Sequence, residues 1–186
     1  LGYRQAIVRV YAQTPTNHFT SVLFNLRHTS LTQTYATNWL EVKLRTTSAC
    51  TTFDFYKSSV VVTHNACTLF SWVGTFGGSS LTNTFTSLPV IEKVDIPDIS
   101  YSAINMASMF LGCTKLYNVT IGALTTGGKT ITSFFTGCSS LVVAPMFNTS
   151  SVPSVASMFE NCTKLKTVPL YDFSSVTNAS LLFSGC

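Results

Sequence analysis

Six cysteines are the residues of this sequence whose chemistry and spacing are most distinctive. Four of them, Cys113, Cys138, Cys162 and Cys186, follow one another at nearly equal intervals. Six cysteines in a secreted chain would suggest three disulfides. The spacing favours another interpretation, because Leu88 holds the same position one interval earlier, and a position that accepts leucine is apolar. We therefore expect these four cysteines to be buried, reduced thiols.

The other two cysteines lie outside this pattern. Cys50 and Cys67 could form a disulfide with each other. The sequence contains no Cys-x-x-Cys or His-x-x-x-His spacing, which zinc sites use. We therefore expect no metal site.

Catalytic patterns are weak in this chain. No motif joins His18, His28 or His64 to a nucleophile, and Gly-x-Ser-x-Gly is absent. The stretch 127–130 resembles the end of a phosphate-binding loop, but that loop requires glycine where this chain has Ala123. The acidic residues are few and scattered. We expect no catalytic residue, no cofactor and a non-enzymatic protein.

A repeat of about 24–25 residues organises the second half of the chain. A unit this short cannot bury an apolar face by itself, whereas stacked units bury a continuous core. The sequence therefore predicts core columns in which one residue of each unit lies above its equivalent. The residues expected to fill these columns are Phe85, Leu88, Phe110, Cys113, Phe135, Cys138, Phe159, Cys162, Phe183 and Cys186.

The first apolar pattern within each unit has helical spacing. Met106, Met109, Phe110 and Cys113 lie at positions i, i+3, i+4 and i+7, and later units repeat the pattern. This spacing places apolar side chains on one face of a short helix. The residue before each repeated cysteine is glycine or asparagine, as at Gly112, which predicts a left-handed residue that ends the helix.

The second apolar pattern follows three, six and eight residues after each repeated cysteine. In one unit it comprises Leu116, Val119 and Ile121, and in the next two units it ends at Met146 and Leu170. The alternation predicts a short strand with one buried face. Stacked units would join such strands into a parallel sheet.

These two patterns resemble a known family. Over about residues 81–186 the motif Met-Phe-x-x-Cys, continued as Cys-x-x-Leu-x-x-Val-x-Leu, is similar to BspA-type leucine-rich repeats. The resemblance implies an α/β solenoid, a leucine-rich repeat array with parallel strands and short helices. It also implies a surface or adhesion protein of bacteria, or a structural protein of tailed bacteriophages, where the same repeats occur.

The first eighty residues do not show the repeat clearly, but they contain short segments rich in β-branched and aromatic residues. These segments are 6–11, 21–26, 39–44, 53–56 and 59–63. Because the end of a repeat array exposes apolar side chains, it needs a cap. We therefore expect residues 1–80 to form a β-rich N-terminal capping module and residues 81–186 to form the repeats. The last unit is incomplete, so we expect further repeats or another subunit to cover Cys186.

The composition excludes several classes of protein. Of 186 residues, 46% are hydrophobic and only 10% are charged, while 28 Thr and 23 Ser supply most of the polar surface. This hydrophobicity argues against disorder. The net charge of +4 contains no basic run, which argues against a nucleic-acid partner. No apolar window approaches the roughly 18 residues that span a bilayer, so we expect no membrane insertion.

Together these observations predict a structural or interaction protein. We expect a component of a bacteriophage virion, in a tail, fibre or surface appendage, that mediates assembly or host attachment. The alternative is a fragment of a bacterial cell-surface adhesin that binds a host or matrix protein. Partners would be other subunits of a multi-copy assembly, a host receptor or a glycan. The candidate contact residues face outward around the expected strands: Glu92, Lys93, Asp95, Tyr117, Asn118, Thr120, Lys166 and Thr167.

Overall fold

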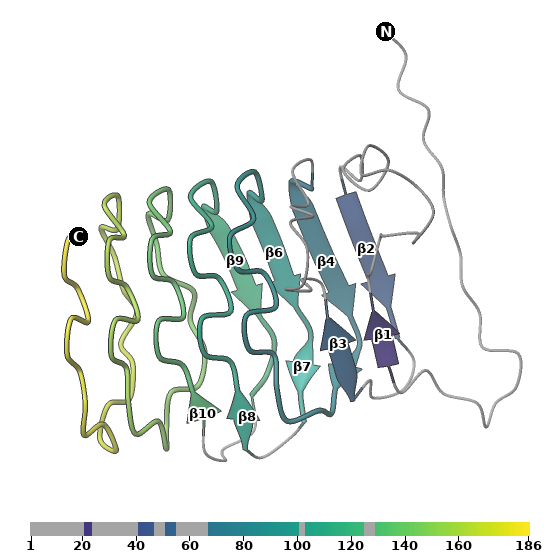
Figure 1. Cartoon of the computed structure of the whole chain (residues 1–186). Coiled ribbons are helices and arrows are strands. Elements are labelled where there is room, and N and C mark those ends of the chain that lie inside the picture. The colour runs from purple at the N-terminus through teal and green to yellow at the C-terminus, as the bar shows by residue number, and fades with distance from the viewer. Residues whose placement is uncertain (1–20, 24–40, 47–50, 55–66, 101–102, 125–128) are drawn as a thin grey trace, which may run out of the picture.

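Successive turns of the chain lie side by side along one axis (Figure 1). We call each turn a coil. The structure, a computed structural model, describes residues 21–23, 41–46, 51–54, 67–100, 103–124 and 129–186. These residues form parallel-paired strands and turns, and no helix occurs among them.

One side of the stack is a parallel sheet of four strands in the order β2-β4-β6-β9. The strands are β2 (Glu41–Arg45), β4 (Leu69–Val73), β6 (Lys93–Ile96) and β9 (Asn118–Ile121). Equivalent residues pair across the sheet, so that Val42 lies opposite Phe70, Phe70 opposite Val94, and Val94 opposite Val119. All four are buried, and they form the inner face of the sheet.

Three short parallel pairs extend the coils. They are β1 (Ser21–Leu23) with β3 (Thr52–Asp54), β5 (Thr75–Phe76) with β7 (Asp98–Ile99), and β8 (Ile104–Asn105) with β10 (Lys129–Thr130). The expected strands at 21–26, 39–44 and 53–56 overlap β1, β2 and β3, whereas those at 6–11 and 59–63 lie outside the described residues. The four-stranded sheet continues from β4 into β6, across residue 80.

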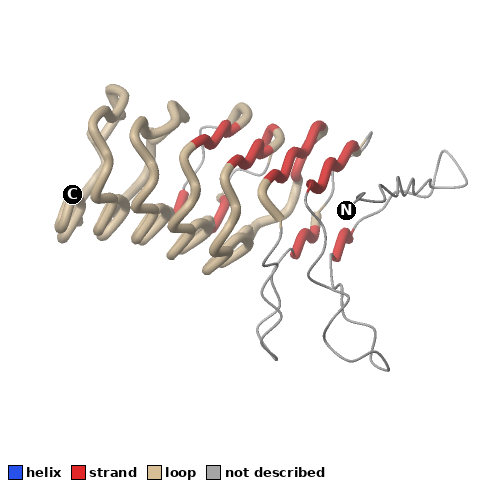
Figure 2. The backbone as a smooth tube through the Cα atoms, turned by 90° about the horizontal axis from the view of Figure 1, so that it is seen from above, coloured by secondary structure: helices blue, strands red, loops and turns tan. Residues whose placement is uncertain are grey.

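The opposite side of the stack consists of turns where the sequence predicts short helices, and the structure corrects that prediction (Figure 2). The backbone N–H of Phe110 donates to the carbonyl of Phe134 at 3.0 Å, and that of Phe135 donates to Met158 at 2.9 Å. In an α-helix these groups would bond four residues back in the same segment. Here they join one coil to the next, and we call this set of bonds the turn ladder.

Left-handed residues at intervals of four explain why no helix forms. Ser108 has φ 54° and Gly112 has φ 73°, and the next coil repeats this with Ser133 at 55° and Gly137 at 75°. A helix requires an unbroken run of right-handed residues. The left-handed backbone predicted at Gly112 is therefore confirmed. Two consecutive short turns, like a helix, direct positions i, i+3, i+4 and i+7 inward.

Phenylalanine rings form a continuous column between the two sides. Ring centroids are 5.5 Å apart for Phe85 and Phe110, 5.3 Å for Phe110 and Phe135, and 5.6 Å for Phe135 and Phe159. The planes of each pair lie within 8° of parallel. Phe53 of β3 continues the contacts at 6.3 Å from Phe85. The column thus ties every coil from β3 onward into one core.

The last two predicted core residues occupy the same columns but are not buried. Phe183 stacks on Phe159 at 5.7 Å and 3°, yet it is 46% exposed, and Cys186 is also exposed. Their coil has a neighbouring coil on one side only among the described residues. The difference from the buried Phe135 therefore reflects position in the stack, since the ring geometry is the same.

A shift of one residue corrects the expected burial of Met146 and Leu170. Met146 is 63% exposed and Leu170 is 93% exposed. The next residues, Phe147 and Tyr171, take the inward positions instead, and their rings lie 5.4 Å apart.

Two prolines account for this shift. Pro145 and Pro169 precede the exposed residues, at the position that Thr120 holds in β9. Proline has no N–H for a strand ladder. The regular sheet accordingly ends at β9, and the isolated bridges Val143–Thr167 and Ser154–Asn178 pair these two coils instead of strands.

Truncating one ring of the column tests the stacking. Phe135→Ala should lower the free energy of unfolding by about 3–5 kcal/mol, because the side chain is fully buried between two rings. Phe183→Ala, at the exposed end of the column, should cost clearly less. Denaturant unfolding followed by circular dichroism measures both. Equal losses for the two variants would contradict the assignment of the column.

Candidate functional site

The outward face of the sheet gathers four of the predicted contact residues on two adjacent strands. Lys93 lies opposite Asn118, and Asp95 lies opposite Thr120. The intervening residues of both strands point into the core, which is why these four face outward. Asn118 and Thr120 are exposed, and Lys93 and Asp95 are partly exposed.

The remaining four predicted residues border the same face at the start of the strand segments. The N–H groups of Tyr117 and Asn118 donate to the carbonyl of Glu92, at 3.1 and 3.2 Å. In later coils the N–H groups of Lys166 and Thr167 donate in the same way to Val142, at 2.9 and 3.3 Å. The eight predicted residues therefore lie on three coils of one surface.

Sequence reasoning missed the coil between these two groups. Val142 and Val143 hold the positions of Tyr117 and Asn118 one repeat later, and are 38% and 56% exposed. The repeat interval alone predicts their outward position, but apolar residues were not considered as candidates for a contact surface. We define the contact face as the eight predicted residues together with Val142 and Val143.

Two ion pairs lie on the outward side of the sheet. Lys43 contacts Glu41 at 2.9 Å and Lys93 contacts Asp95 at 3.6 Å, each pair along one strand. Exposed pairs of this kind contribute little to stability, at most about 1 kcal/mol. They do neutralise charge locally. Lys115, Lys164 and Lys166 take no part in an ion pair with any described residue.

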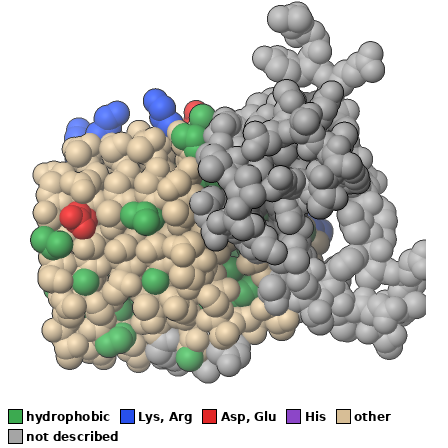
Figure 3. Space-filling view, viewed as in Figure 1, with side chains coloured by type: hydrophobic (Ala, Val, Ile, Leu, Met, Phe, Trp, Pro, Cys, Tyr) green, Lys and Arg blue, Asp and Glu red, His purple; other side chains and the backbone are tan. Residues whose placement is uncertain are grey.

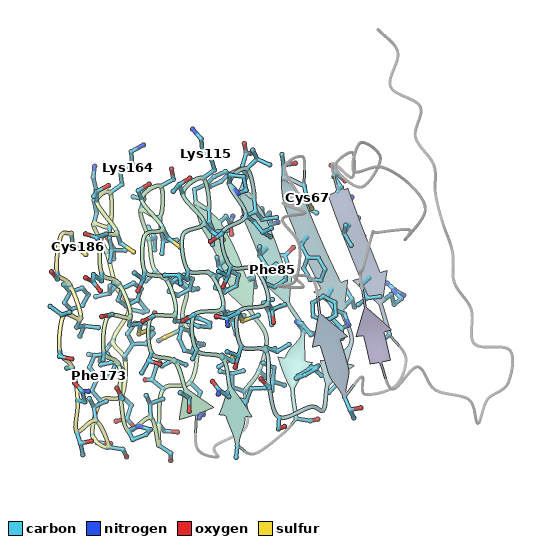
Figure 4. All side chains as sticks on the ribbon, in the orientation of Figure 1. Cys67, Phe85, Lys115, Lys164, Phe173 and Cys186 are labelled. Atoms are coloured by element: carbon cyan, nitrogen blue, oxygen red, sulfur yellow. The ribbon has the colours of Figure 1, made fainter. Side chains whose placement is uncertain are left out.

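The turn side of the stack is chemically plainer. Figure 3 shows it as a mostly uncharged surface with scattered hydrophobic side chains and an acidic one, and with basic side chains along its upper edge. Figure 4 places Lys115 and Lys164 at that edge, where the turns meet the sheet. Hydroxyl groups on this side serve the fold, since Thr86 Oγ1 donates to the carbonyl of Ser108 in the next coil at 2.7 Å. The sheet side therefore carries the more varied set of charged, polar and apolar side chains.

The repeated cysteines are free thiols that donate hydrogen bonds to backbone carbonyls of the neighbouring coil. The Sγ–H of Cys113 donates to the carbonyl of Phe85 at 2.8 Å, and that of Cys138 donates to Phe110 at 3.2 Å. Burial raises the pKa of Cys113 to about 12, because the thiolate would lose its hydration. Such thiols are poor nucleophiles. Cys67 is also free and buried, and Cys50 lies outside the described residues.

Lys129, the lysine of the stretch that resembled a phosphate-binding loop, is turned into the protein. Its side chain is buried, Nζ donates to the carbonyl of Ser150 at 3.0 Å, and burial lowers its pKa. The described residues contain no cluster of three His, Cys, Asp or Glu that would hold a metal. Among the described residues there is no helix that is long and apolar enough to cross a bilayer.

The repeats identify the family of this chain. A family model described as "Mycoplasma protein of unknown function, DUF285" matches residues 79–186. The chain belongs to this family. The matched region begins at Ser79, beside the bridge residue Ser80, and includes both the turn ladder and the whole contact face. Neither the curated proteins nor the solved structures gave a significant match.

Thiol labelling tests the cysteine column. In a Cys50→Ser variant at about pH 8, a disulfide-exchange reagent should modify only the exposed Cys186 quickly. After denaturation all five remaining cysteines should react, because none is oxidised. Cysteines that stay unreactive after denaturation would contradict the assignment of free thiols.

The raised thiol pKa also predicts a pH dependence. The folded chain keeps the proton of Cys113 to about pH 12, while the unfolded chain loses it near pH 9. The contribution of this thiol to stability is therefore complete below pH 9 and falls as the pH rises. At about pH 10.5 the loss should be about 2 kcal/mol.

A Cys113→Ala variant isolates this effect from the titration of other groups. Although less stable at about pH 8, it should lose less stability than the parent chain between about pH 8 and about pH 10.5. Urea unfolding at the two pH values measures the difference. Parallel losses in the two proteins would show that the thiol is not held protonated by burial.

Proposed function

We propose that this chain is a non-enzymatic interaction protein whose contact face binds another protein. The observation that supports this most directly is the division of the sheet into two faces. Inward residues such as Val94 and Val119 build the core, whereas the outward residues beside them vary from coil to coil in charge and polarity. A surface whose side chains the fold does not require is available for recognition.

The proposal includes the architecture expected from the sequence. The stacked parallel coils and the nearly constant repeat interval support a solenoid of BspA-type leucine-rich repeats over residues 81–186, with residues 1–80 as its N-terminal cap. Adjacent parallel strands present equivalent residues in rows about 4.8 Å apart. Such rows suit an extended or flat protein partner.

The setting is either a virion or a bacterial surface. The family description names Mycoplasma, a genus of bacteria, which supports the second of these. We therefore propose a bacterial cell surface as its location, where its partner would be a host protein or another surface subunit. A structural role in a phage particle is the alternative.

Site-specific photo-cross-linking in the source cells tests the proposed function. A photoreactive amino acid in place of the exposed Thr120 should give a covalent adduct with one recurrent protein. The same replacement of Thr82, which is equally a threonine and exposed but lies on the turn side, should not. Mass spectrometry identifies the adducts.

A second replacement, of Asn118 beside Thr120 on β9, should yield the same partner. Equal labelling from Thr82 and Thr120, or no protein adduct from either position on β9, would overturn the proposal. Surface proteolysis of intact cells, with detection of the released fragment, separates a surface location from an internal one.

A further inference from the structure

We propose that one end of the contact face, together with exposed residues that border it, binds an extended protein segment that carries acidic residues followed by apolar ones. This deepens the proposed function and rests on it. The surface concerned, which we call the basic apolar patch, comprises Val143, Met146, Leu170, Lys115, Lys164 and Lys166. These residues lie on three successive coils.

The apolar part of the patch is exposed at equivalent positions of neighbouring coils. Met146 is 63% exposed and Leu170, its equivalent one repeat later, is 93% exposed. Val143 is 56% exposed and pairs with Thr167 through the isolated bridge. Single exposed apolar residues are normal, whereas several gathered on adjacent coils mark a surface that is covered in use.

Charge indicates what covers it. Lys115, Lys164 and Lys166 make no ion pair with a described residue. The two acidic residues after residue 100 lie elsewhere. The N–H of Glu160 bonds within the turns, and Asp172 Oδ1 accepts the N–H of Ser174 in the turn after the strand segment.

The opposite end of the sheet lacks this excess of positive charge. Its outward charged residues balance, with three basic and three acidic side chains: Lys43, Arg45, Lys93, Glu41, Glu92 and Asp95. Among the described residues of the sheet side, positive charge therefore accumulates only where the apolar residues are exposed. An acidic partner complements this end of the face and not the other.

The order of residues along a coil sets the order within the partner. Lys164 and Lys166 come first, Val143 lies beside Thr167, and Met146 and Leu170 follow three residues later. At about 3.3 Å per residue, the three residues from Val143 to Met146 span about 10 Å along the coil. Lys164 and Lys166 precede Leu170 by six and four residues, so a matching extended segment places its acidic residues about four to six positions from the apolar residues that contact Met146 and Leu170.

Selection from a library of random displayed peptides of about 16 residues tests this, because such peptides span the patch when extended. Enriched peptides should combine Asp or Glu with Leu, Ile, Val or Phe at the spacing above. Synthetic versions should bind the full chain in an anisotropy assay, and raising NaCl from about 50 mM to about 300 mM should weaken binding several-fold.

Matched variants locate the site. Lys164→Gln with Lys166→Gln should raise the Kd about tenfold and flatten its salt dependence, whereas Lys43→Gln with Arg45→Gln should leave it unchanged. Met146→Ser with Leu170→Ser should weaken binding about tenfold, whereas Val73→Ser, 56% exposed on β4, should not. All these positions are exposed, and an unchanged Tm confirms that each variant is folded.

Three results would overturn the inference: no enriched peptide, enriched peptides without acidic residues, or equal effects of the patch variants and their controls. Vesicles containing phosphatidylserine provide a further arm. Binding to them that depends on the same lysines, without peptide binding, would assign the patch to a membrane surface. If the cross-links from Thr120 and Asn118 succeed while the peptide result fails, the contact face stands and only its acidic partner class is wrong.

Discussion

The constraint on which this structure depends is that each coil must complete its backbone hydrogen bonds on the next. On the sheet side this is the parallel ladder from β2 to β9, and on the turn side it is the turn ladder through residues such as Phe110 and Phe134. Both ladders need a nearly constant interval between equivalent residues. The repeat interval is therefore fixed by bonding geometry, and the Phe and Cys columns follow from it.

The same constraint explains the composition. Where neighbouring coils lie close together, small side chains fit between them. Hydroxyl groups there form hydrogen bonds to the next coil, as Thr86 does to the carbonyl of Ser108. Few charged side chains fit there, since a charge close to its equivalents in adjacent coils would be repelled by them. Charge is thus concentrated on the outward sheet face and the edges, where it is available for recognition.

Much of the core was predictable from the sequence because equivalent residues of successive repeats are buried alike. The Phe column, the buried thiols and the left-handed Gly112 required only the alignment of the units. The turns were not predictable, because side-chain periodicity does not show where a backbone N–H bonds. Ser108 is left-handed without being glycine or asparagine, so nothing in its type signals the break.

The candidate site was predictable in part for a related reason. Alternation within one strand identified Lys93, Asp95, Asn118 and Thr120 as outward residues. It failed after Pro145 and Pro169, where proline ends the ladder and the inward position moves by one residue. The exposed Met146 and Leu170 were therefore assigned to the core, although the prolines that expose them are visible in the sequence.

The bonding of coil to coil is measured most directly by NMR scalar couplings across hydrogen bonds. We predict a coupling between the amide nitrogen of Phe110 and the carbonyl carbon of Phe134, and likewise between Phe135 and Met158. Both would place the donor and the acceptor in neighbouring coils. Coupling of Phe110 to the carbonyl of Met106 instead, as in an α-helix, would contradict the account.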